Sequence, residues 1–496
     1  MKSYRPYSPE QSYLLAPSPR EWLPEGHLAY YVLDFVEELD LGVIERELQR
    51  KDARGERPYS PRMMSALLLY GYAVGVFSSR KIERATYEDV AFRVLAAGEH
   101  PHFTTINEFR ARHRAAIADL FQQVLEVCMS AGLVKLGHVA IDGTRMKANA
   151  SKHKAMSYER MKKEEARLKA EVEALLQRAE ATDAAEDAQY GVGKQPEDLP
   201  AELQRRDGRR LKIREALAAL KKETAKARAT EHIELADNLR AVAPTMKTSR
   251  QQAELFTRAD QHDQMAADLD DEDPPPPAVD SDVPRNTPPK RPSGEPKPKA
   301  QRNFTDPDSR IMFHDGTYMQ AYNAQIAVDE SHQIIVAAVL SNQGTDAQYF
   351  EPVLRRVVEN CARAPDVVTA DAGYCSTANV RAAERLGSEP FIAVGSHRND
   401  GYPVETVMGA NPENDERQRM RAVLETERGH AIYARRKATV EPVFGQIKAA
   451  RRIRQMSFRG LWKSRCEWLL ICTTHNLLKL WRSVLKSPAR RHAQPA

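Results

Sequence analysis

The chain has 496 residues, with 74 Lys or Arg and 69 Asp or Glu, and its formal net charge at pH 7 is +5. This length suits two or three domains with a sizeable core, and the high charge suits a globular protein with solvated helices. The longest apolar run, Met63–Phe77, is too short to span a bilayer, and five scattered cysteines without a CxxC pair fit a reducing compartment. Because the N-terminus also lacks an apolar signal region, we expect a cytoplasmic protein without a membrane partner.

The N-terminal part is predicted to be helical. After a tail at 1–25, apolar residues recur at three and four spacing through 26–135. Near the end of this region, FTTINEFRARHR offers a threonine cap followed by Arg110, Arg112 and Arg114. This pattern suits a DNA-reading helix-turn-helix, or equally a helical bundle with a basic edge, and the sequence leaves both interpretations open.

The next segment, 136–152, is predicted to form the first part of an α/β core. An apolar run there ends in Asp142-Gly143-Thr144. It has the pattern of a buried strand that delivers a carboxylate at its end. Taken alone, an Asp-Gly pair after a strand is more often an ordinary turn.

Residues 153–302 change character and are predicted to form an insertion. Met161 and Leu168 lie on one narrow apolar seam, and Ile213 and Leu220 lie on another. Two charged helices with such seams indicate an antiparallel helical hairpin. The charged, proline-rich stretch that follows, up to about residue 302, is expected to be disordered or polyproline-like.

The segment 303–480 shows the order strands, helix, strand, helix, strand, helix, which predicts an α/β layer. Within it, DVVTADAGY is a buried strand that ends at Asp371, and Ser396–Arg428 is polar and loop-like. The last helical run contains Glu441 and is followed by a basic tail at 481–496.

Three carboxylates are predicted at positions where they could contribute to a functional site. Asp142 and Asp371 end strands, and Glu441 is predicted just inside a helix, with Thr439 as its cap and Pro442 in the first turn. In open α/β sheets, sites form at the carboxyl ends of strands. Carboxylate oxygens suit Mg²⁺, and two such ions can clamp the attacking and leaving oxygens of a phosphodiester.

Glu441 is the only acid in a strongly basic run. Residues Ala434–Arg465 contain ten Lys or Arg, so this run attracts polyanions such as nucleic acid. On a regular helix, Lys448 and Arg452 would share the face of Glu441. Glu441 is therefore predicted either to pair with an arginine or to hold a metal that faces a phosphate.

Together these motifs resemble a known family. Asp142-Gly143-Thr144, ADAGY around Asp371 and VEPVFGQIK around Glu441 are similar to motifs of the DDE transposases of bacterial insertion sequences. That family has a Tyr-x2-Arg-x3-Glu-x6-Lys pattern, and Glu441-x6-Lys448 fits it. Lys437 stands at the arginine position with Arg436 beside it, and Tyr433 is one place off.

The resemblance implies an α/β, RNase H-like mixed sheet interrupted by the helical insertion and preceded by an all-helical domain. It implies cleavage of double-stranded DNA at insertion-sequence ends and strand transfer into a target, by a homodimer associated with the bacterial nucleoid. Asp142, Asp371 and Glu441 would bind two Mg²⁺ ions, with Mn²⁺ as a substitute. The residues expected to bind DNA are Arg436, Lys437, Lys448, Arg451, Arg452 and Arg454.

Three alternatives remain at the level of sequence. An RNase H-like nuclease or resolvase would cleave without strand transfer, and an inactive relative would only bind DNA. A structural coiled-coil protein would leave the strand-end acids and the basic run unexplained. Within the enzyme interpretation, Asp346 is the alternative to Asp371.

Overall fold

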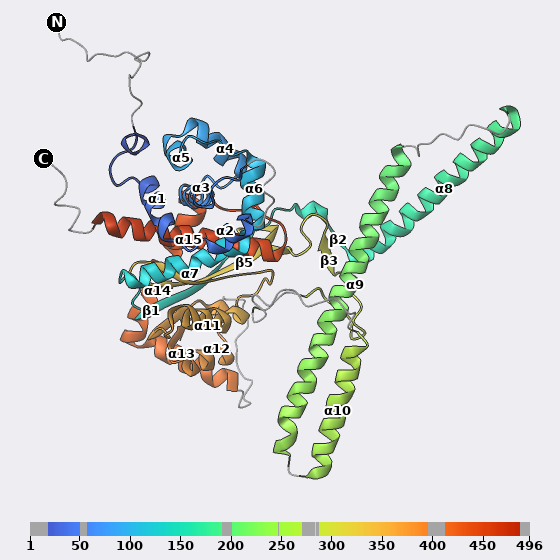
Figure 1. Ribbon diagram of the computed structural model, residues 1–496. Helices are drawn as coiled ribbons and strands as arrows, with labels where there is room; N and C mark the ends of the chain where they lie inside the picture. The colour runs from blue at the N-terminus through green and yellow to red at the C-terminus, as the bar shows by residue number, and fades with distance from the viewer. Residues whose placement is uncertain are drawn as a thin grey trace, which may run out of the picture.

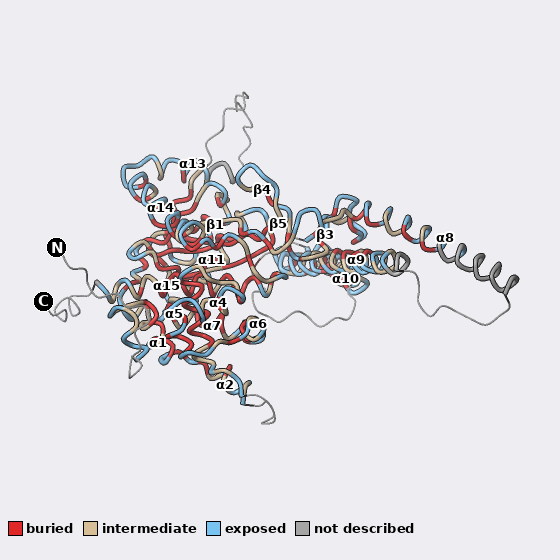
Figure 2. Tube along the Cα trace, turned by 90° about the horizontal axis from the view of Figure 1, so that it is seen from above, coloured by how far each residue is buried: buried red, intermediate tan, exposed pale blue. Residues whose placement is uncertain are grey.

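The computed structural model describes residues 18–49, 57–190, 201–246, 248–269, 283, 287–394 and 412–486. These residues form a body of helices around a mixed β-sheet, with a helical arm projecting from one side (Figures 1 and 2). The tails predicted at 1–25 and 481–496 lie largely outside the described residues, although the last helix, α15, continues to Lys486.

The central sheet joins strands that are far apart in the chain. The strands are β1 (His138–Lys147), β4 (Arg310–His314), β5 (Thr317–Asp329), β6 (Ile334–Ser341), β7 (Val367–Ala370) and β8 (Glu389–Ile392). β4, β5 and β6 form antiparallel pairs, β1 pairs antiparallel with β5, and β7 and β8 continue the sheet in parallel beside β1. This mixed sheet is an RNase H-like α/β core, so the predicted fold class is confirmed.

Helices cover both faces of the sheet. In Figure 1, α7 and α15 lie on the side of the N-terminal helices, and α11 to α13 lie on the opposite side. Coverage on both faces explains why the ten residues from Gln320 to Asp329 in β5 are all buried. The later helices are α11 (Phe350–Cys361), α12 (Thr377–Arg385), α13 (Pro412–Glu425), α14 (Glu427–Gly445) and α15 (Leu461–Lys486).

The N-terminal helices pack directly on this core. They are α1 (Leu28–Glu38), α2 (Gly42–Gln49), α3 (Pro61–Val74), α4 (Ser79–Glu88), α5 (Val90–Leu95), α6 (Phe103–Arg112) and α7 (Arg114–Ser130). One continuous hydrophobic core includes residues of these helices and of the sheet. The hydroxyl of Tyr72 on α3 donates to Glu467 on α15 at 2.8 Å. None of the described helices is long and apolar enough to cross a membrane.

Helix α6 differs from the predicted basic helix in two ways. His102 caps it, and its Nδ1 accepts a hydrogen bond from the Thr104 amide at 3.4 Å. Arg110 is buried and donates to the Tyr72 hydroxyl at 2.7 Å and to the Phe77 carbonyl at 3.1 Å. A guanidinium used inside the protein is not free to read a DNA groove, so this placement favours the bundle interpretation of the N-terminal region.

The described residues of the arm form three helices where the sequence pattern indicated two. They are α8 (Tyr158–Tyr190), α9 (Ala201–Val242) and α10 (Ser249–Ala267), and a short pair, β2 (Ala155–Ser157) and β3 (Gln301–Asn303), closes the base. The predicted seams of α8 and α9 do pack together in a small cluster of their own. Helix α10 packs along the second part of α9 (Figure 1). Its buried apolar residues are Ala259 and Ala266, which are too small to produce a recognisable seam.

Part of the predicted disordered stretch is ordered. Residues 287–302 run back along α9, where Lys290 pairs with Glu231 at 2.6 Å and the Pro292 carbonyl accepts from Arg228 at 3.1 Å. These contacts anchor a proline-rich segment that buries little apolar surface. Residues 270–282 and 284–286 lie outside the described part of the chain.

The polar segment predicted as a loop is also partly helical. Residues 412–425 form α13, and α14 begins at Glu427, whereas 395–411 lie outside the described residues. Helix α13 is held mainly by ion pairs, such as Arg419 with Glu384 at 2.7 Å, and it buries Met420. A helix with so few apolar contacts gives almost no periodic signal in the sequence.

Candidate active site

Strand register brings Asp142 and Asp371 together. β1 and β7 run parallel, with Ile141 opposite Ala370. Asp142 and Asp371 are the next residues along the two strands, so both carboxylates lie where β7 leaves the sheet. The prediction that Asp142 ends its strand is wrong, because β1 continues to Lys147 by pairing with β5, and it is β7 that ends here.

Asp142 is a largely buried carboxylate with a cation beside it. Its side chain is 16% exposed, and its Oδ2 accepts from Arg436 Nη1 at 2.9 Å. Its Oδ1 accepts from the Gly143 amide at 2.7 Å. Burial raises the pKa of Asp142 to about 6 with help from the charge of Asp371, while Arg436 and the Gly143 amide act in the opposite direction. The ionised form therefore depends on neighbouring positive charge.

Asp371 is fixed by the turn that follows β7. Its Oδ1 accepts from the Gly373 amide at 2.8 Å and so caps the turn Ala372–Tyr374. A Cβ at position 373 would lie 3.0 Å from this oxygen, so glycine keeps the space around the carboxylate open. Burial raises the pKa of Asp371, whereas the Gly373 amide and Arg436 lower it. Both aspartates thus show the pKa shift expected of adjacent, partly desolvated acids.

Arg436 on α14 lies between the aspartate pair and Glu441. Its side chain is 8% exposed, and its Nη2 is 3.8 Å from Glu441 Oε1. The ring of Tyr433 lies 5.8 Å from the guanidinium carbon. Glu441 is 54% exposed, so its contact with Arg436 is long and solvated. An arginine pair at Glu441 exists, but it is weak enough to leave the carboxylate available for another partner.

Helix α14 places these residues differently from the prediction. Thr426 caps the helix by accepting from the Gly429 amide at 3.0 Å. Glu441 therefore lies near the end of a long helix, and the expected start at Thr439 is wrong. The early start was missed because Ser396–Arg428 reads as a polar loop.

Pro442 lies inside this helix, where it cannot donate the usual hydrogen bond to the carbonyl of Ala438. The Gln333 side chain supplies the missing donor, with its Nε2 2.9 Å from that carbonyl. Gln333 in turn accepts from Lys479 of α15 at 2.7 Å. A loop residue from the β5–β6 connection therefore stabilises the helix at the turn that carries Glu441.

A π-helical turn follows α14 and redirects the basic residues. Lys448 points back to β1, where its Nζ donates to Thr144 Oγ1 at 2.5 Å and to the Arg145 carbonyl at 2.9 Å. Burial lowers the pKa of Lys448. Arg452 lies beyond the turn, with a φ of 58°. The predicted common helical face of Glu441, Lys448 and Arg452 is therefore not formed.

The neighbouring arginines of this region have different surroundings. Arg451 is 5% exposed and donates to Thr474 Oγ1 at 2.8 Å and to the Ile471 carbonyl at 3.2 Å, both on α15. Its guanidinium lies inside the protein, which differs from the phosphate contact expected from the sequence. Of the six residues predicted to bind DNA, Lys437, Arg452 and Arg454 are exposed.

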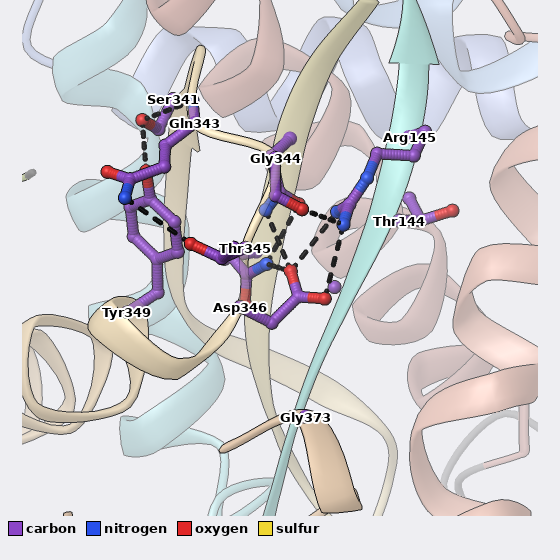
Figure 3. A network of polar contacts seen from close by, with 12 residues as sticks. Thr144, Arg145, Ser341, Gln343, Gly344, Thr345, Asp346, Tyr349 and Gly373 are labelled. Carbon is purple, nitrogen blue, oxygen red and sulfur yellow. Dashed lines mark hydrogen bonds and ion pairs between the residues drawn. The ribbon is translucent and has the colours of Figure 1, made fainter. Parts of the chain in front are cut away.

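A polar network beside the aspartates was not foreseen as a unit. Asp346 receives hydrogen bonds from both terminal nitrogens of Arg145, at 3.1 and 3.2 Å (Figure 3). Asn323 and Gln325 on β5 donate to the same carboxylate at 2.7 and 2.8 Å, and Tyr374 donates to Gln325. Asp346 is thus fully engaged in bracing β1 and β5. Two polar residues at alternate positions of the apolar strand YNAQIAVD were the signal in the sequence.

The oxygen donors of Asp142 and Asp371 suit a hard divalent cation. Two adjacent carboxylates with raised pKa values need compensating positive charge, and Mg²⁺ prefers such ligands. In the described ranges, no three side chains of His, Cys, Asp or Glu are grouped closely enough to hold an ion. Glu441 completes a set of three only if its exposed side chain turns toward the aspartates.

Comparison with known families identifies the chain. Residues 279–477 match the Transposase DDE domain, and residues 17–112 match a second family, the Transposase domain (DUF772). The chain belongs to the DDE transposases. The family suggested by the three sequence motifs is therefore confirmed, and DNA is the substrate that this family implies. No curated protein and no solved structure matches the chain significantly.

The two matched regions of this transposase do not include all three candidate acids. The DDE-domain match contains Asp371 and Glu441, whereas Asp142 lies between the two matches. The reason is visible in the fold, because the arm separates β1 from all other strands of the central sheet. The assignment of Asp142 depends on its strand register with Asp371.

Proposed function

We propose that this transposase cleaves DNA at the ends of an insertion sequence and joins the freed ends to target DNA. Asp142, Asp371 and Glu441 are its catalytic acids. The observation that carries the proposal is the alignment of Asp142 and Asp371 in adjacent parallel strands, both with raised pKa values. The transposase families matched before and after β1 support a role of this acidic pair in DNA transposition.

Asp142 and Asp371 are proposed to bind Mg²⁺, with Glu441 as the third ligand and Mn²⁺ as a working substitute. When bound, two such ions stabilise the negative charge on the attacking and leaving oxygens of the phosphodiester. In the first step water attacks the phosphodiester and the 3′-oxygen leaves as a free 3′-hydroxyl. In the second step this hydroxyl attacks a phosphodiester of the target strand and displaces that strand's own 3′-oxygen.

Two cations of the chain, Arg436 and Lys448, support the metal-binding role proposed for the acids. Arg436 lowers the pKa of Asp142 and so favours the ionised form that a metal needs. Lys448 holds the Thr144–Arg145 backbone just after Asp142. Both cations are positioning residues, because their contacts are with protein groups.

The exposed cations beside the acids are proposed to hold DNA phosphates. Lys437, Arg452 and Arg454 are exposed on the segment that follows or contains Glu441. Neutralised phosphates release counterions, so binding should weaken steeply with salt. Joining two ends in one reaction requires at least two copies of the site, so we propose that a homodimer assembles on DNA.

The test uses the full chain, Mg²⁺ and a linear DNA carrying the sequences that flank its gene. Asp142→Asn should lower the cleavage rate by about 10³-fold or more, since it removes a charged group from the centre of the chemistry. The Kd for the same DNA should stay within about threefold. Asp366→Asn is the matched control, because Asp366 is exposed just before β7 and pairs only with Arg363 among the described residues.

The outcomes separate the alternatives. Cleavage at the wild-type rate by Asp142→Asn would remove this residue from the site. Cleavage by the wild type without joining to a target plasmid would favour a nuclease or resolvase. DNA binding by the wild type without any cleavage would favour an inactive relative.

A further inference from the structure

A cleft of about 950 Å³ lies where the arm meets the body, apart from the acidic site. Its walls come from the start of the arm, from α9 and from the segment that returns to the body. Cations dominate the charged side chains of its lining, with Glu215 as the one acid among them. The cations that line it are Lys154, Arg160, Arg209, Lys212 and Arg302.

Only part of this positive charge is neutralised within the protein. Arg209 pairs with Glu164 at 2.8 Å, and Arg302 pairs with Glu223 at 2.8 Å. The remaining cations of the lining are exposed, and the described residues give them no ion-pair partner within 4 Å. These are Lys154, Arg160 and Lys212.

The charge of the arm is graded toward this cleft. Residues 201–228 contain ten Lys or Arg and four Asp or Glu, whereas residues 229–268 contain four Lys or Arg and seven Asp or Glu. A helical arm that needed charge only for solubility would have no reason to separate the two signs. Within residues 201–268, the excess of cations therefore lies in the part of α9 that lines the cleft and its surroundings.

Further cations connect the cleft to the acidic site. The Lys147 amide donates to the Arg454 carbonyl at 3.2 Å, which places two exposed cations together beyond Lys448. Arg459 donates to the Asn149 carbonyl at 3.1 Å, and the chain then continues into the cleft wall at Lys154. A row of cations that leads out of a cleft suits a polymer of phosphates better than a single small anion.

We propose that this cleft is a second binding site for the phosphate backbone of double-stranded DNA. It holds the duplex beyond the segment at the acids, so the arm acts as a clamp on the flanking DNA. Because its ligand is the substrate of the reaction proposed above, the cleft rests on that function while using none of its catalytic residues.

Crosslinking tests the location directly. A photoreactive residue introduced as Ala219→p-benzoylphenylalanine lies in the cleft lining, whereas Ala253→p-benzoylphenylalanine lies on an exposed position of α10 and serves as control. The full chain is irradiated with a radiolabelled 40-base-pair duplex in EDTA, so cleavage plays no part. A crosslink at 219 and none at 253 is expected. Absence of a crosslink at 219 in protein that binds the duplex overturns the proposal.

Salt dependence tests the chemistry. Lys154→Ala combined with Lys212→Ala should weaken binding of the same duplex about tenfold and reduce the slope of log Kd against log salt by about two, one for each phosphate that is no longer neutralised. Arg250→Ala combined with Arg258→Ala removes two exposed cations from α10 and should change neither quantity. Equal losses of DNA affinity in the two double variants would show that the cations act only by general charge attraction. That result would overturn the proposal that the cleft is a binding site.

Two further outcomes separate this proposal from the catalytic one. Protection of Ala219→p-benzoylphenylalanine from DNA crosslinking by millimolar inorganic phosphate alone would assign the cleft to a small anion and overturn it. When Asp142→Asn is combined with Ala219→p-benzoylphenylalanine, the yield of the DNA crosslink at position 219 should equal that of the protein with the photoreactive residue alone. A normal crosslink with failed cleavage would therefore count against the acids and leave the cleft in place.

Discussion

The sheet that carries Asp142 and Asp371 and the helix that carries Glu441 position their acids in different ways. The two aspartates are fixed by strand register and by backbone amides that hold one oxygen of each carboxylate. Glu441 extends from a helix that contains a proline and ends in a π-helical turn, and its carboxylate is half exposed. The comparison indicates that two of the proposed metal ligands are preorganised and that the third, Glu441, has the freedom to adjust.

Length changes at the acids should give the largest difference between the two regions. Asp371→Glu should lower cleavage by about 10²-fold or more, because the longer side chain gives up the hydrogen bond from Gly373 and displaces the carboxylate. Glu441→Asp should lower it by only about tenfold, because an exposed side chain can adapt. Single-turnover cleavage measures both. Equal losses in the two variants would show that Glu441 is as rigidly placed as the aspartates.

Alanine variants of the adjacent residues Arg451 and Arg452 test which side chain stabilises the π-helical turn after α14. Arg451→Ala should lower the free energy of unfolding by about 2–3 kcal/mol, because it removes buried hydrogen bonds to α15 and leaves a cavity. Arg452→Ala should change it by less than about 0.5 kcal/mol, since Arg452 is exposed. Urea unfolding gives both values. A stable Arg451→Ala protein with weakened DNA binding would restore the expected phosphate contact.

The smallest expected effect concerns the support under Glu441. Gln333→Ala removes the donor to the Ala438 carbonyl and should cost about 1 kcal/mol of stability. Cleavage should fall only a few-fold, because the sheet still holds the aspartates. Gln348→Ala, at an exposed position, is the control. Hydrogen exchange should show faster opening of α14 in Gln333→Ala alone, and unchanged exchange would mean that water replaces the glutamine without loss.

The sequence predicted the position of a residue best where strand geometry alone determines it. The buried strands that carry Asp142 and lead to Asp371 can be read from apolar runs, although the first continues past Asp142, and their parallel pairing then brings the two residues together. The start of α14 was not readable, because a polar helix held by ion pairs lacks apolar periodicity. Arg451 and Arg452 are chemically identical in the sequence, and only tertiary packing buries one and exposes the other.

The arm shows the same limit in another form. The seams at Met161 and Ile213 indicated the pairing of α8 with α9, since large apolar residues must be buried. The packing of α10 depends on alanines and on ion pairs such as Arg240 with Asp260, which leave no periodic pattern. The Asp346 network likewise joins residues from distant segments that only the folded sheet brings together.

The short β2–β3 pair has a consequence for the modularity of the chain. It pairs Ala155 with Asn303, so the two ends of the whole arm are neighbours, about 5 Å apart as in any antiparallel pair. A turn of a few residues has the right span to join them. A shorter segment can therefore replace the arm at its root without altering the pairing of β1, so the arm can be exchanged as a unit.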